Sequence, residues 1–380
     1  MLQLPPLSLY IHIPWCIRKC PYCDFNSHQA GTELPEQEYI QALLADLDHD
    51  LTWVQGREIH SIFFGGGTPS LFSAAAYQAL FNGLQQRLGF AADIEITLEA
   101  NPGTFEAEKF AAYRQLGINR LSIGIQSFNP QHLQALGRVH DSAQAQRAVA
   151  LAKQAGFDNF NLDLMYGLPG QTAEQALADI HQALAFEPPH LSWYQLTIEP
   201  NTEFYKSPPR LPQDDDLWDI QEAGLALLAQ QGFEHYEISA HAKPGQAARH
   251  NLNYWQFGDY LGIGAGAHGK ITLPQTQQII RTQKTRLPKD YLNPVKPFLT
   301  SQQPIAADEI GLECLMNALR LKDGMPTAAF LQRTGLTLDA VAKPLQKAQQ
   351  LGLLQVDERI MATAKGQQYL NELLALFLAD

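Results

Sequence analysis

Cysteine is scarce in this chain, and its scarcity limits how the fold can be held together. Only four cysteines occur in 380 residues, and three of them, Cys16, Cys20 and Cys23, form one short run. Their odd number and close spacing, with an N-terminus that lacks a basic head and a long apolar core, argue against a disulfide-stabilised secreted protein. The chain is therefore expected to work in the reducing cytoplasm.

Long apolar runs and an excess of positive charge are also missing. No stretch approaches the ~20 apolar residues that a membrane-spanning helix needs, so any membrane contact would be peripheral. The formal net charge is −12, with 39 Asp and Glu against 27 Lys and Arg. Non-specific attraction to a phosphate backbone is therefore not expected, and nucleic acid is an unsuitable partner.

The sequence does contain a Cys-x3-Cys-x2-Cys run directly after an apolar segment, residues 7–13. Iron–sulfur cubes are usually held by four thiolates, so three close cysteines without a nearby fourth predict a cluster with one iron open to a non-protein ligand. A closed zinc site with His28 as fourth ligand is the alternative that spacing alone leaves open. The remote Cys314 lies in an apolar helical stretch and is expected to be a buried thiol.

Short apolar segments alternate with longer amphipathic ones, as strands alternate with helices in a parallel sheet. The six expected strands are 7–13, 58–64, 93–100, 120–128, 157–165 and 190–198. Helical spacing of apolar residues occurs in 36–54, 73–88, 143–155 and 172–186. Six such units are two short of a closed eight-stranded barrel, so an α/β fold with a partial (β/α)6 barrel is predicted.

Three of these strands carry a polar residue at every second position. The polar positions are Glu95, Thr97, Glu99, Ser122, Gly124, Gln126, Asn159, Asn161 and Asp163. Because side chains alternate between the two faces of a strand, this set should face the barrel interior. A polar interior predicts an open barrel that holds a ligand.

Beyond residue 198 the pattern loosens and indicates two further parts. We expect residues 1–232 to form the barrel domain, 233–300 an irregular extension and linker, and 301–380 a winged-helix-like helical domain. Winged helices often bind DNA, but residues 301–380 hold 7 Lys and Arg against 9 Asp and Glu. This balance favours an interaction or covering role.

The cysteine run, its strand and the barrel resemble the radical S-adenosylmethionine (SAM) superfamily. Further motifs resemble the oxygen-independent coproporphyrinogen III oxidase-like family, especially its heme chaperone branch: Tyr-Ile-His-Ile-Pro-Trp-Cys at 10–16, Gly-Gly-Gly-Thr-Pro at 65–69, Glu-Ala-Asn-Pro at 99–102 and His-Asn-Leu-Asn-Tyr-Trp at 250–255. The resemblance covers nearly the whole chain. It implies a [4Fe–4S] cluster whose open iron is chelated by SAM, and electron transfer that cleaves SAM to a 5′-deoxyadenosyl radical.

The resemblance also implies roles for individual residues. The cluster ligands would be Cys16, Cys20 and Cys23, and the amino-acid part of SAM would meet Gly66, Gly67 and Thr68. The other positions implied around SAM, or around a second SAM or its equivalent, are Tyr10, Tyr22, Glu99, Gln126, Arg138 and Asp163. Carboxylates suit ribose hydroxyls, and the fork of donors on arginine suits a carboxylate.

Histidine is a common axial ligand of heme iron, and His250 opens the motif at 250–255. We take His250 as the expected heme ligand, with a packed structural role as the alternative. The rival ligands are His140, His241 and His268. The neighbouring aromatics Tyr254, Trp255 and Phe257 would form an apolar porphyrin wall or belong to the core.

Two departures separate the chain from the oxidase branch. Phe25 stands where the oxidase carries a further cysteine, and only nine residues precede Tyr10 where the oxidase has a longer extension. We therefore expect a chaperone that binds cluster, SAM and heme, without coproporphyrinogen III oxidase activity. Its partners would be heme acceptors such as respiratory enzymes and an electron donor such as flavodoxin or ferredoxin. Dimerisation and peripheral membrane contact stay open.

Two other functions compete with this expectation. One is an oxygen-independent coproporphyrinogen III oxidase or another radical SAM enzyme of porphyrin metabolism, in which the radical would abstract hydrogen from substrate. The other is a zinc-stabilised binding module, which would lack the absorption of an iron–sulfur cluster.

Overall fold

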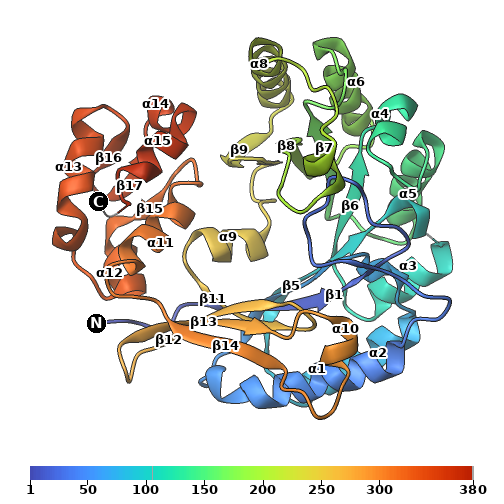
Figure 1. Ribbon diagram of the computed structural model, residues 1–380, viewed down its shortest axis with the longest axis horizontal. Helices are drawn as coiled ribbons and strands as arrows, with labels where there is room; N and C mark the ends of the chain where they lie inside the picture. The colour runs from blue at the N-terminus through green and yellow to red at the C-terminus, as the bar shows by residue number, and fades with distance from the viewer. Residues whose placement is uncertain (105, 379–380) are drawn as a thin grey trace.

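The computed structural model describes residues 1–104 and 106–378. A sheet of twelve strands forms its centre (Figure 1), in the order β14-β13-β12-β11-β1-β4-β5-β6-β7-β8-β10-β9. The six strands expected from the sequence are parallel neighbours: β1 (Leu7–Ile13), β4 (Ile59–Gly66), β5 (Phe90–Ala100), β6 (Arg120–Gln126), β7 (Phe160–Tyr166) and β8 (His190–Gln195). The sheet curves without closing, which confirms the partial barrel.

Helices between these strands cover the outer face of the sheet (Figure 1). The four that the sequence predicts are α1 (Glu36–Asp50), α2 (Ala74–Gln85), α5 (Ser142–Gln154) and α6 (Ala173–Leu184). Three more are α3 (Ala107–Gln115), α4 (Pro130–Ala135) and α8 (Asp214–Gln230), with a short α7 (Glu203–Lys206). Apolar faces of helices and strands share one core. No described helix is long and apolar enough to cross a membrane.

The segment 233–300, expected to be irregular, is largely strand and helix. At one edge β9 (Glu234–Glu237) and β10 (Ala240–Ala242) continue the sheet antiparallel beyond β8. At the other edge β11 (Asp259–Ile263) pairs parallel with β1, followed by β12 (His268–Leu273), β13 (Gln278–Lys284) and β14 (Leu299–Pro304). The segment also holds α9 (Arg249–Trp255) and α10 (Pro288–Tyr291). Pairing with β1, distant in sequence, stabilises strands that show no long apolar run.

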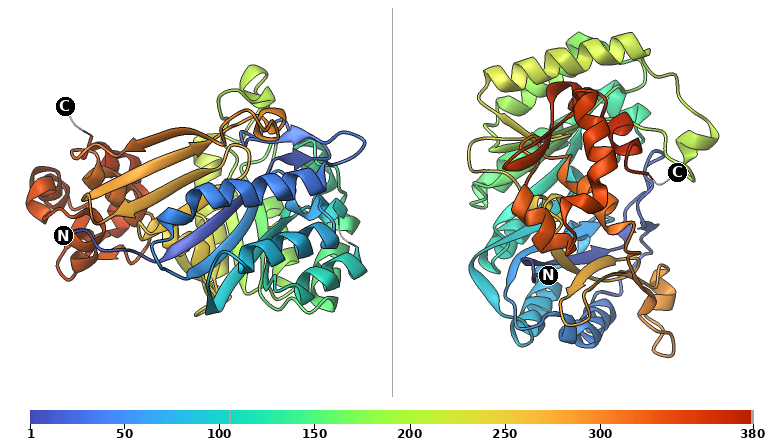
Figure 2. Two further views of the ribbon diagram at one scale, coloured as in Figure 1. Left: turned by 90° about the horizontal axis from the view of Figure 1, so that it is seen from below. Right: turned by 90° about the vertical axis from the view of Figure 1, so that its left-hand side faces the viewer.

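The C-terminal part has the arrangement that its helical spacing predicts. It consists of α11 (Ile310–Ala318), α12 (Thr327–Thr334), α13 (Ala342–Gln350), α14 (Ala364–Gln368), α15 (Leu370–Ala375) and a small antiparallel sheet of β15 (Met325–Pro326), β16 (Leu354–Val356) and β17 (Arg359–Ala362). It lies at one end of the molecule beside the N-terminus (Figure 2), and Leu2 packs into its separate core. Cys314 is fully buried there, as expected. The domain boundaries themselves stay a prediction.

A buried ion cluster fastens β13 to α1. Lys284 Nζ lies 2.5 Å from Asp46 Oδ1 and 2.7 Å from Asp50 Oδ2, and all three side chains are almost wholly buried. The hydroxyl of Tyr291 donates to Asp46 Oδ2 at 2.6 Å. Burial raises the pKa of Asp50 to about 6, although Lys284 attracts the carboxylate. The contact between β13 and α1 therefore depends on one ammonium group that is shared by two carboxyl groups.

Replacing this lysine should destabilise the fold. Lys284→Met leaves Asp46 and Asp50 buried without their cation, and the free energy of unfolding should fall by about 3–5 kcal/mol. Urea unfolding measures the change, with the exposed Lys289→Met as control, which should stay within about 0.5 kcal/mol of wild type. Equal stabilities of the two variants would contradict the role of this ion cluster.

Candidate functional site

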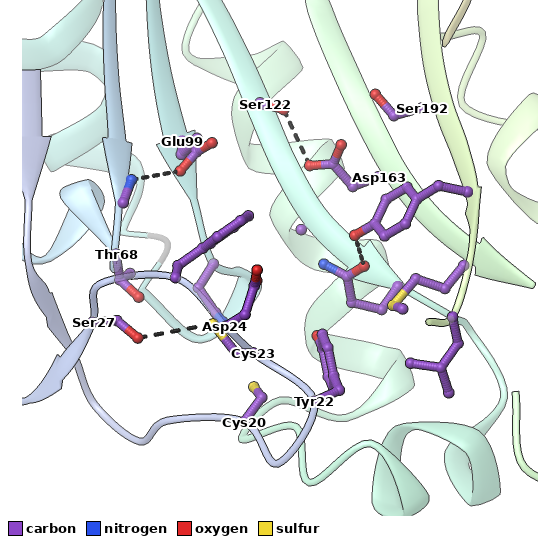
Figure 3. A pocket seen from close by; sticks show the side chains of 18 of the residues that line it. Cys20, Tyr22, Cys23, Asp24, Ser27, Thr68, Glu99, Ser122, Asp163 and Ser192 are labelled. Atoms are coloured by element: carbon purple, nitrogen blue, oxygen red, sulfur yellow. Dashed lines mark hydrogen bonds between the residues drawn. The ribbon is translucent and has the colours of Figure 1, made fainter. Parts of the chain in front are cut away.

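The three cysteines lie on a loop that leaves β1 and closes on itself. Within it β2 (Trp15–Cys16) pairs with β3 (His28–Gln29). Ala30 N donates to Cys16 O at 2.8 Å, and Cys23 N donates to Cys20 O at 3.1 Å. One bond closes the base of the loop and the other forms a turn within it. All three cysteines line one cavity, and Figure 3 shows Cys20 and Cys23 beside it.

This cavity, of about 500 Å³, lies within the barrel at the C-terminal ends of the parallel strands. Its size is typical of small-molecule sites, and its place is where ligand sites gather in such barrels. The residues expected from the sequence that line it are Cys16, Cys20, Tyr22, Cys23, Gly66, Gly67, Thr68, Glu99, Gln126, Arg138 and Asp163. The polar faces of β5, β6 and β7 meet here, so the expected polar interior is confirmed.

The glycine segment after β4 is in direct contact with the cysteine loop. Gly67 N donates to Ile13 O and Thr68 N to Trp15 O, both at 2.7 Å. A Cβ atom at Gly67 would lie 2.5 Å from the Trp15 carbonyl oxygen, and one at Gly66, whose φ is +111°, would lie 2.4 Å from the ring of His12. The bare backbone therefore packs against the loop itself, and Gly66, Gly67 and Thr68 also line the cavity, so their contact with SAM stays a prediction.

Glu99, near the end of β5, faces the cavity beside this glycine segment. Its Oε2 accepts a hydrogen bond from Gly66 N at 3.2 Å. Burial, reinforced by the charge of Asp163, raises the pKa of the Glu99 carboxyl to about 8. A cationic or hydroxyl-bearing ligand would stabilise the ionised form, so this carboxyl can release a proton when such a ligand binds.

Asp163 stands across the cavity from Glu99 (Figure 3), and Gln126 also lines the cavity. Asp163 accepts hydrogen bonds from Asn161 Nδ2 at 2.7 Å and Ser122 Oγ at 3.1 Å. Gln126 Oε1 accepts one from the hydroxyl of Tyr194 at 2.7 Å. The φ of Gln126 is +69°, an unfavourable conformation for a non-glycine residue that is often retained at functional sites.

Arg138 joins this wall to the cysteine loop. Its Nη2 donates to Gly124 O at 2.8 Å and its Nη1 to Cys20 Sγ at 3.5 Å. Tyr22 lies on the same side, with its ring centroid 6.3 Å from that of Phe204. A thiol that binds iron is deprotonated, and the positive charge of the guanidinium would stabilise the resulting thiolate.

Two expected residues, Tyr10 and His250, do not line this cavity. The hydroxyl of Tyr10 lies 2.9 Å from His12 Nδ1, and its side chain faces a second cleft. His250, on α9, is 2% exposed, and its Nδ1 lies 3.0 Å from Ser61 Oγ. Its ring stacks on Phe63 at a centroid distance of 4.9 Å. His250 lines neither of these two cavities.

The donor set of the loop fits an iron–sulfur cube better than a single zinc ion. His28 is the fourth ligand that a zinc site would require, and one of its two ring nitrogens, Nε2, already lies 3.3 Å from Asn26 Oδ1. A cube tolerates wider spacing, because each thiolate binds a different iron.

The cavity also contains residues that the sequence did not single out. On β8, Ser192 and Tyr194 face it, and Met165 and Thr197 lie nearby. The period-two pattern that marked β5 to β7 continues through Ser192 and Tyr194 and could have identified them. Arg320 reaches the cavity from the C-terminal part, and no local pattern signals its position.

The raised pKa of Glu99 predicts a pH-dependent stability. A carboxyl with an ordinary pKa of 4.5 in the unfolded chain and about 8 in the fold contributes stability below about pH 4.5 that is lost as the pH rises through about 8. Glu99→Gln should therefore match wild type near pH 4, roughly half a unit below the ordinary pKa, and exceed it near pH 9 by up to about 5 kcal/mol. Chemical unfolding without SAM across this range measures the difference. The exposed Glu58→Gln should follow wild type throughout, and parallel profiles for all three proteins would contradict the assignment.

Comparison with known proteins shows where the chain belongs. Residues 10–183 match the radical SAM superfamily and residues 305–369 the HemN C-terminal domain. The chain is 53% identical to the heme chaperone HemW of Escherichia coli (strain K12) and 52% identical to that of Haemophilus influenzae, with 100% of each chain covered. The solved structure of the coproporphyrinogen III oxidase HemN from Escherichia coli is similar, with a TM-score of 0.83, 26% identity and coverage of 98% of this chain and 90% of that chain.

Superfamily membership implies a [4Fe–4S] cluster and SAM, and the loop and cavity have the donor groups for both. The identity to HemW proteins extends over the full chain, so it assigns a family within the superfamily, which the shared barrel alone does not do. The chain therefore belongs to the radical SAM superfamily and, within it, to the HemW family.

Proposed function

We propose that the chain is a cytoplasmic heme chaperone that binds a [4Fe–4S] cluster, SAM and heme, and delivers heme to acceptors such as respiratory enzymes. The proposal is supported by full-length similarity to proteins named heme chaperones. Phe25 is the observation that favours a chaperone over an oxidase. It is 59% exposed and lines the cavity beside the cysteine loop. An apolar side chain stands there in place of the oxidase's further cysteine.

Cys16, Cys20 and Cys23 would hold the cluster, which when bound supplies a redox-active iron with an open coordination position. Burial raises the pKa of the Cys16 and Cys23 thiols, while hydrogen bonds, including one from Ser27 to each, lower it. Loading iron therefore requires these thiols to release protons. Thr68, which also hydrogen-bonds Cys16, stabilises the thiolate form.

Other residues of the chain would bind and orient SAM. Gly66, Gly67, Thr68 and Tyr22 line the cavity beside the loop, and Tyr10 would approach SAM from the adjoining second cleft. Glu99 offers a carboxyl for hydroxyl groups or a cation, across the cavity from Gln126, Arg138 and Asp163. Cleavage of SAM would require an electron, which a donor such as flavodoxin or ferredoxin would supply.

An oxygen-independent coproporphyrinogen III oxidase is the second candidate. The similarity to the HemN structure, with a TM-score of 0.83, favours it. Phe25 argues against it, because a thiol at this position has been replaced by a side chain without acid–base or redox chemistry. Both candidates share the cluster and SAM, so only assays with heme and porphyrinogen distinguish them.

The cluster assignment is tested by removing each thiol. Cys16→Ala, Cys20→Ala and Cys23→Ala should each lose most of the iron, sulfide and brown colour after anaerobic reconstitution, because two thiolates hold a cube poorly. Iron and sulfide analysis and absorption spectra provide the measurement. Cys314→Ala is the matched control and should retain a full cluster. Loss of iron in the control, or its retention in the triple variant, would refute these ligands.

The chaperone and the oxidase are separated by activity. Reconstituted protein should bind heme and transfer it to an apo-protein acceptor, since a carrier must hold its cargo reversibly. It should not convert coproporphyrinogen III to protoporphyrinogen IX, even with SAM and a strong reductant, and HemN from Escherichia coli serves as positive control. Robust SAM-dependent release of carbon dioxide by this chain would overturn the proposal and favour the oxidase.

A further inference from the structure

The four histidines that the sequence offers as heme ligands differ in how exposed they are, and so in whether a ligand can reach them. His250, His140 and His241 are 2%, 3% and 2% exposed. His140 Nε2 lies 3.1 Å from Ile125 O, and His241 stacks on His235 at a centroid distance of 4.3 Å. Heme iron lies at the centre of a broad plate, so its axial ligand must border a space of similar breadth. His268, the first residue of β12, is the exposed member of the four.

His268 lines the second cleft, which has a volume of about 430 Å³. This cleft lies between the cysteine loop and the added strands β11 to β13. The residues that distinguish it from the barrel cavity include Tyr254, Tyr260, His268, Gln283 and Arg286, while Asp24, Phe25, Gly66 and Glu99 line both spaces. The cleft thus adjoins the cavity beside the cysteines, with which it shares these four lining residues.

The ring of His268 is free to bind a ligand. Within the part of the chain that the structure describes, neither of its ring nitrogens makes a hydrogen bond. His12 also lines the cleft, but its ring nitrogens lie 2.9 Å from the Tyr10 hydroxyl and 2.8 Å from Asn26 O. Burial, and then the charge of Arg281, lower the pKa of His268. This favours the neutral imidazole, which is the form that binds metal.

The walls of the cleft suit a flat aromatic molecule that carries carboxylates. The rings of Tyr254 and Tyr260 lie 4.3 Å apart between centroids. Phe25 adds an exposed apolar face. Arg286, exposed at the cleft, donates through Nε to Asn26 Oδ1 at 3.2 Å, and its terminal amino groups make no hydrogen bond among the described residues. A guanidinium fork of this kind pairs well with a carboxylate.

We propose that this cleft is the heme site, with His268 as the axial ligand of the iron, Tyr254 and Tyr260 against the porphyrin, and Arg286 paired with a propionate. The inference rests on the proposed function and adds the location of the cargo. It assigns His250 to the packing of α9 against β4. Heme would lie across the wall formed by Gly66 and Glu99 from the cavity next to the cysteines, and the loop residues Asp24 and Phe25 would border both ligands.

Axial ligation is tested by substituting the exposed histidine. His268→Ala in the reconstituted full chain should weaken heme binding at least tenfold and shift the heme absorption band and the electron paramagnetic resonance signal of ferric heme. Added imidazole should restore the wild-type spectra. The exposed His60→Ala is the matched control and should behave as wild type, as should His250→Ala in its spectra. Wild-type affinity and spectra in His268→Ala, or spectra altered only in His250→Ala, would overturn the inference.

The cleft is tested independently by filling it. Gln283, on β13, lines the cleft at a distance from the barrel cavity, so Gln283→Trp should reduce heme affinity while iron content and SAM affinity stay at wild-type values. Loss of SAM binding with intact heme binding would overturn the inference, because the cleft would then belong to the SAM site. If wild-type protein binds no heme, the proposed function fails as well; if wild type binds heme and both variants match it, only the location fails.

Discussion

The close contact of two backbone segments is the constraint on which the site depends. Gly66 to Thr68, at the end of β4, lie against Ile13 to Trp15, at the end of β1, and two backbone hydrogen bonds of 2.7 Å join them. A single methyl group at residue 66 or 67 would overlap His12 or Trp15. Because the cysteine loop starts at this contact and Glu99 accepts from Gly66 N, one steric condition positions the thiols, the glycine segment and the carboxyl together.

The carboxyl groups that line the barrel cavity differ in how many hydrogen-bond donors they have. Asp163 is hydrogen-bonded by Asn161 and Ser122, and Gln126 by Tyr194. The Glu99 carboxyl has one backbone donor, and its pKa is raised to about 8. An enclosed carboxyl with so few partners is costly to ionise, so the cavity gains most from a ligand that brings hydroxyl donors or positive charge. The second cleft differs in chemistry, with aromatic walls and a free imidazole.

How much of the site could be predicted follows from sheet geometry. In a parallel sheet the strand ends meet at one edge, so Glu99, Gln126 and Asp163 could be placed together from their positions on successive strands. Elements without a strong apolar pattern could not be predicted from the sequence. One example is α3, which buries only Phe110 and Tyr113 of its nine residues. The strands β11 to β13 were not predicted either. β11 is stabilised by pairing with β1, from Leu7 opposite Asp259 to Ile11 opposite Ile263. Pairing between segments so far apart in the chain leaves no pattern in the local sequence.

The sequence by itself determined the chemistry of this protein: three thiols in one run, a polar face on each of three strands, and a phenylalanine in place of a further cysteine. Those properties are local, since spacing and period-two alternation decide them. Only the tertiary structure decided which groups a ligand can reach. In the fold, Tyr10 faces the second cleft, His250 stacks on Phe63, and His268 is exposed in the same cleft as Tyr260. The sequence could not show this, because burial depends on contacts between residues that are far apart in the chain.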